Sequence, residues 1–106
     1  MTRSDEERVA DILDAAREIE ELVADGREAW DSDRTRRLAV ERLLEIIGES
    51  ARAMSDDGRA GCPDVDWSDV IGLRTVLAHH YHRVDPDQVW AIASRELPLL
   101  VQQLER

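Results

Sequence analysis

The chain of 106 residues has a net charge of −10, is 42% hydrophobic and 36% charged, and contains three tryptophans, one tyrosine and one cysteine. This length allows one modest core, and a single cysteine excludes an internal disulfide framework. A core of aliphatic residues with few aromatic ones favours helices over sheets. We therefore expect one all-α domain that spans residues 1–106.

The N-terminal segment predicts a long amphipathic helix. Ser4 and Glu7 have the spacing of a capping box, which predicts a helix that begins at about Asp5. Apolar residues then recur at helical spacing as far as Val23, and Gly26 ends this run or loosens it.

A second helix is expected from Ser32 or Asp33 to about Met54. Its centre is apolar on more than one side, which predicts burial against several neighbours or across a subunit interface. Periodicity then vanishes, and turn-forming residues gather between Ser55 and Asp66. This segment is expected to be a loop.

The C-terminal half predicts two further helices. Asp66 or Ser68 caps the first of them, which is expected to end near His82. Asp85-Pro86 starts the second, because aspartate is a good cap and proline is harmless at the first helical position. Pro98 lies inside this last helix and predicts a kink or a short break.

These elements predict an up-and-down bundle of four to five helices. No apolar run is long enough to span a membrane, and the N-terminus is charged where a secretion signal would be apolar. We therefore expect a cytoplasmic protein that does not associate with membranes.

The charge is distributed unevenly, and this limits how the chain could bind nucleic acid. Residues 1–58 hold 17 acids and 9 arginines, a net charge of −8, whereas residues 59–106 hold 7 acids and 5 arginines, a net charge of −2. Phosphate contacts supply most non-specific affinity for nucleic acid. A broad basic binding face is therefore excluded. Either RNA enters a local cleft, or the functional partner is a protein.

All three histidines, at positions 79, 80 and 82, lie within four residues, and three interpretations compete. The first is a metal site, which lacks nearby cysteine and would need ligands from a partner. The second is a helix C-terminus, where imidazolium favours the negative end of the helix dipole. The third is catalysis, because histidine exchanges protons near neutral pH.

The catalytic interpretation becomes more specific when Arg74 is considered together with the histidines. Arginine binds a phosphate through two hydrogen bonds, and a histidine acts as general base or acid on the ribose, so the two suffice for RNA cleavage without a metal. On an ideal helix Arg74 and His79 lie about 140° apart, whereas Arg74 and Tyr81 share a face. A cleft shared by two subunits, each with its own pair, would resolve this offset.

Three blocks of sequence together carry a resemblance to a known family. They are Ile46-Ile-Gly-Glu49, the tryptophan at position 67, and the arginine, histidine and tyrosine at positions 74, 79 and 81. With this pattern the chain resembles the HepT-like family of HEPN proteins from about residue 8 to its end.

The resemblance implies a HEPN domain that dimerises and acts as a metal-independent endoribonuclease toxin on RNA, with Arg74 and His79 as the catalytic pair. It implies no cofactor on this chain. It also implies a partner, a minimal nucleotidyltransferase antitoxin of a type VII system, which transfers AMP from ATP to Tyr81 and so silences the nuclease.

The chain departs from the family pattern at one position. Thr75 follows the arginine where the family usually has asparagine, and threonine lacks the paired donor and acceptor of an amide. This difference and the acidic first half favour an alternative: a weakly active or inactive HEPN subunit that binds the nucleotidyltransferase and accepts its AMP.

Overall fold

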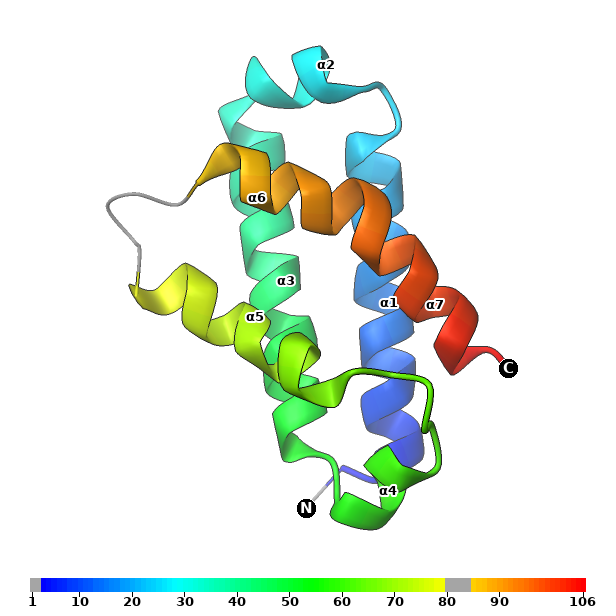
Figure 1. Cartoon of the computed structure of the whole chain (residues 1–106). Helices are drawn as coiled ribbons and strands as arrows, with labels where there is room; N and C mark the ends of the chain where they lie inside the picture. Colours follow the sequence, from blue (N-terminus) through cyan, green and yellow to red (C-terminus); the bar gives the residue numbers. More distant parts are fainter. Residues whose placement is uncertain (1–2, 80–84) are drawn as a thin grey trace.

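The computed structural model describes residues 3–79 and 85–106, with the backbone alone at 75–79, and these ranges are helical with short connections (Figure 1). The elements are α1 (Asp5–Val23), α2 (Arg27–Asp31), α3 (Arg34–Ala53), α4 (Asp56–Ala60), α5 (Trp67–His79), α6 (Pro86–Ala91), the π-helical turn η1 (Ile92–Glu96) and α7 (Leu97–Leu104). The predicted all-α class is confirmed for these ranges. None of the helices described is long and apolar enough to cross a membrane.

The two longest helices, α1 and α3, lie side by side and form the base of the fold (Figure 1). Helix α5 crosses α3, and the rod formed by α6, η1 and α7 crosses the pair obliquely and packs on α1. The core lies between the α1–α3 pair and the elements that cross it, α5 and the rod. Its most deeply buried large side chains are Ile12, Ile19, Trp30, Val40, Leu44, Ile47 and Val89.

All four predicted helix starts are confirmed, at Asp5, Arg34, Trp67 and Pro86, and each depends on a local cap. Ser4 Oγ accepts a hydrogen bond from the Glu7 amide at 3.1 Å, and the Glu7 carboxylate accepts one from the Ser4 amide at 3.0 Å. Asp33 caps α3, and Asp85 caps α6 with Pro86 in the first turn. Such caps satisfy amide groups that the first turn of a helix leaves unpaired.

The prediction of a loop between Ser55 and Asp66 was wrong in part, because α4 occupies five of these residues. Ser55 caps α4 through a 2.9 Å hydrogen bond from the Gly58 amide to Ser55 Oγ. Asp5 holds Ser55 in place, since its carboxylate accepts hydrogen bonds from the Ser55 amide, at 2.9 Å, and from the Ser55 hydroxyl. A contact fifty residues away in sequence therefore supports this short helix.

Pro98 interrupts its helix as predicted, and the interruption is a π-helical turn. Proline has no amide hydrogen to bond to the carbonyl of Ser94, and its ring crowds that carbonyl. The chain widens just before it, so that the Leu97 amide bonds to the carbonyl of Ile92, five residues back. Two residues of this wide turn, Ile92 and Glu96, line a hollow between the rod and α5.

Candidate functional site

Helix α5 carries both residues of the predicted catalytic pair. It begins at Trp67, whose indole nitrogen donates a 2.9 Å hydrogen bond to the carbonyl of Arg59, and Asp66 accepts a 3.2 Å bond from the Asp69 amide in the first turn. The helix then continues to His79. Because α5 is continuous from Trp67 to His79, positions 74 and 79 lie on one helix, about 140° apart around its axis.

Arg74 lies at the crossing of α5 and α3, opposite Gly48. A Cβ placed on Gly48 would lie 2.9 Å from the backbone nitrogen of Arg74, 3.1 Å from its Cβ and 3.4 Å from its Cα. Gly48 is buried and Arg74 is half-buried. The arginine side chain therefore starts from the face of α5 that packs on α3.

Sequence reasoning did not assign a role to this glycine. An isolated glycine inside an apolar helical run costs stability, and this was the signal that it has a packing role. The two helices approach so closely that a hydrogen fits at position 48 and a methyl group does not.

The other sequence-predicted residues are placed only in part. His79 is the last residue of α5, and the side chains of His79 and Thr75 are not among those described. Tyr81 lies outside the described residues, as do the two neighbouring histidines at positions 80 and 82.

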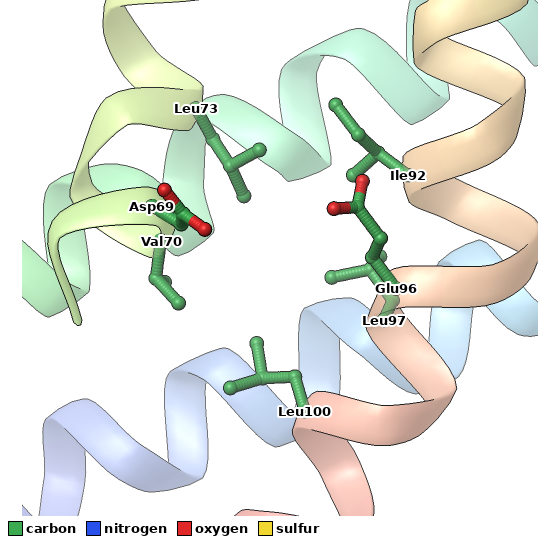
Figure 2. A pocket seen from close by; sticks show the side chains of 7 residues that line it. All are labelled: Asp69, Val70, Leu73, Ile92, Glu96, Leu97 and Leu100. Atoms are coloured by element: carbon green, nitrogen blue, oxygen red, sulfur yellow. The ribbon is translucent and has the colours of Figure 1, made fainter. Parts of the chain in front are cut away.

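A groove separates α5 from the rod of η1 and α7 (Figure 2). Its floor is apolar and is formed by Val70, Leu73, Ile92, Leu97 and Leu100. Carboxylates of Asp69 and Glu96 lie on its two sides. An adjoining hollow extends the groove along α5 past Ser68 and Gly72 toward α6.

This groove suits RNA poorly, because no cation is among the residues that line it and its carboxylates repel phosphate. By helical spacing, position 79 falls within about 20° of Gly72, on the face of α5 that borders the groove. Arg74 instead lies on the face that packs against Gly48. Within the described part of one chain, the two positions therefore do not converge on one cleft.

One carboxyl on the face of α3 that meets α5 has an altered proton affinity. Glu41 lies seven residues before Gly48, and this spacing places both on one face of α3. Partial burial raises the pKa of the Glu41 carboxyl, and the charge of Arg37 opposes this rise in part. The charged form of Glu41 is therefore disfavoured by its surroundings.

Comparison with known proteins identifies the family. Residues 12–106 match the family described as "Ribonuclease HepT-like". The chain is 34% identical over 96 residues to a protein of Methanocaldococcus jannaschii named "Putative RNase MJ1380", covering 90% of this chain and 88% of that one. It is 31% identical over 107 residues to "Probable ribonuclease HepT" of Thermococcus cleftensis, covering 100% of this chain and 97% of that one.

No solved structure matches the chain. The family match covers α3, α5 and the C-terminal rod completely, and it includes the crossing of Gly48 and Arg74. Since the match extends over most of the sequence and the two relatives are matched over nearly their whole lengths, the chain belongs to the HepT-like ribonuclease family.

Proposed function

We propose that this protein is a metal-independent endoribonuclease in which Arg74 and His79 are the catalytic residues. Its membership of the HepT-like ribonuclease family carries the proposal, and the presence of both residues on one continuous helix supports it. His79 would move the proton of the ribose 2′-hydroxyl or of the leaving oxygen. Arg74 would stabilise the negative charge that develops on the phosphate.

The active form would be a homodimer that builds its cleft from two chains. Positions 74 and 79 face different sides of α5, and the groove beside α5 has carboxylates on its sides. A two-fold axis presents the same surface twice, so that Arg74 of one chain and His79 of the other could act on one phosphate. Two guanidinium groups would also supply local positive charge in a protein of net charge −10.

Regulation would occur through Tyr81. We propose that a minimal nucleotidyltransferase antitoxin, the second component of a type VII toxin–antitoxin pair, transfers AMP from ATP to this hydroxyl. Tyr81 falls seven residues after Arg74 in the sequence motif. An added AMP would bring a bulky anion toward the site and compete with RNA phosphate for the arginine.

Expression in a bacterial host tests the nuclease. Wild-type protein is expected to stop growth and fragment cellular RNA, whereas Arg74→Ala and His79→Ala are expected to do neither. Arg95→Ala and His80→Ala are the matched controls, since each removes the same kind of side chain from a position without a proposed role. If all five proteins leave growth and RNA unchanged, the nuclease proposal fails.

The intact mass of the protein tests the proposed regulation and the alternative of an inactive AMP acceptor. Incubation with ATP and a cognate minimal nucleotidyltransferase should add the mass of AMP to the wild type and not to Tyr81→Phe. AMP addition to a chain that cleaves no RNA would favour the inactive acceptor. Addition that survives Tyr81→Phe would contradict the assignment of Tyr81.

A further inference from the structure

The crossing of α3 and α5 at Gly48 is a contact between two backbones. The atoms nearest to an added Cβ at position 48 are the nitrogen, Cβ and Cα of Arg74. At 2.9 Å from the nitrogen, such an atom would be closer than carbon and nitrogen atoms pack in proteins. Backbone atoms cannot rotate away as a flexible side chain can, so α5 itself would have to move.

The other glycines show that this restriction is specific to position 48. An added Cβ at Gly72, within α5, would meet nothing within 4 Å. At Gly58 it would meet the side chain of Asp5, and at Gly61 a carbonyl at 3.3 Å within the same short segment. Among the glycines, therefore, Gly48 is the position at which an added Cβ would meet the backbone of another long helix.

Glycine is also a poor residue for the place it occupies. Helix α3 has 20 residues, and position 48 lies in its interior. Glycine loses more conformational freedom than alanine when it enters a helix, so alanine would stabilise α3 taken alone. The contact with Arg74 provides the reason for glycine at this position.

We propose that Gly48 is a positioning residue for Arg74. Its missing side chain sets how deeply α5 lies on α3, and so fixes the point from which the Arg74 side chain begins. This inference rests on the proposed role of Arg74 in RNA cleavage. Because a misplacement of about 1 Å can reduce a reaction rate on the order of 100-fold, a shift of α5 at this residue should lower turnover.

The experiment compares Gly48→Ala with Gly72→Ala in the full chain. Both changes add one methyl group inside a helix, but only the first places it against a neighbouring backbone. Activity is measured at a temperature where circular dichroism shows each variant fully folded. Gly48→Ala is expected to lower kcat between about 10- and 100-fold, with KM changed less, and Gly72→Ala is expected to retain wild-type kcat and KM.

A double-mutant cycle with Arg74→Lys distinguishes an effect of Gly48→Ala that acts through Arg74 from a general structural effect of the substitution. If Gly48 acts through Arg74, the losses of the two single variants should not multiply in the double variant. Multiplied losses, or wild-type turnover in Gly48→Ala, would overturn the proposal. If Gly48→Ala is too unstable, the change is made together with Gly72→Ala, which adds helix stability at an open position.

A failure of the proposed nuclease function can be told apart from a failure of the positioning role of Gly48. If Arg74→Ala cleaves RNA as fast as the wild type, Arg74 is not catalytic, and NMR still tests the geometry. The backbone amide signal of Arg74 should shift strongly in Gly48→Ala and weakly in Gly72→Ala. An unshifted Arg74 amide in Gly48→Ala would overturn the positioning role whatever the activity.

Discussion

The indole rings of Trp30 and Trp90 lie 5.6 Å apart between centroids, tilted by 47°, and join α2 to α6. Arg27 reinforces this contact from α2, since its guanidinium lies 5.7 Å from the Trp30 ring and donates a 2.7 Å hydrogen bond to Asp87. Tilted aromatic pairs and cations over rings each stabilise such contacts modestly. Together they fix the start of α6, which follows the segment that contains Tyr81.

Trp30 is therefore expected to contribute most to stability where α2 packs on α6. It is 1% exposed, and Trp30→Ala should lower the free energy of unfolding by about 3 to 5 kcal/mol, because it leaves a large cavity. Trp30→Phe should cost clearly less, since it keeps most of the ring and removes an indole nitrogen that is buried without a partner among the described residues. Urea unfolding measures the loss of unfolding free energy in both variants. Equal losses would show that the cavity does not explain the effect.

The contact of Asp5 with Ser55 predicts a dependence of stability on pH. Hydrogen bonds from the Ser55 hydroxyl and amide hold the pKa of the Asp5 carboxyl below its usual range. A group with a lowered folded pKa adds stability above its unfolded pKa, and this stability is lost as the pH falls through the folded value. Asp5→Asn should therefore melt at a lower temperature than the wild type at neutral pH.

That difference in melting temperature should shrink as the pH falls from about 5 to about 2, where the wild-type carboxyl becomes protonated. Glu6→Gln is the control, since Glu6 is exposed on the same helix and makes no hydrogen bond through its side chain in the described part of the chain. A difference for Asp5→Asn that stays constant across this range would contradict the role of the charge.

Glu41 predicts a pH effect of opposite sign. Burial raises the pKa of its carboxyl, so the folded chain binds the proton more tightly than the unfolded chain does. Stability is therefore lost as the pH rises through the folded pKa, and Glu41→Gln should melt at a higher temperature than the wild type at pH 7. The gain should vanish below about pH 4, near the ordinary pKa of glutamate. Glu49→Gln, exposed on the same helix, should show no such gain.

Local signals in the sequence predicted much of the fold. The starts of α1, α3 and α6 could be located because each depends on a side chain that caps its own first turn, at Ser4, Asp33 and Asp85. The interruption before Pro98 could be located for the same reason, since a missing amide acts within one turn. These predictions needed no knowledge of the partners across the core.

The elements that the sequence did not predict depend on distant contacts. Helix α4 has five residues, too few to show periodicity, and Asp5 orders its cap from fifty positions away. The same limit applies to the candidate site. That Arg74 and His79 share one helix could be predicted from the pattern, whereas the packing of Arg74 on Gly48 depends on how two helices cross.

The most direct measurement of the central claim is RNA cleavage by the purified protein in the presence of EDTA. Wild-type protein should cleave RNA under these conditions, and His79→Ala and Arg74→Ala should each reduce the rate by about 100-fold or more. His80→Ala and Arg95→Ala should keep the wild-type rate. Cleavage that EDTA abolishes, or that continues unchanged in His79→Ala and Arg74→Ala, would contradict the assignment of a metal-independent ribonuclease site to these two residues.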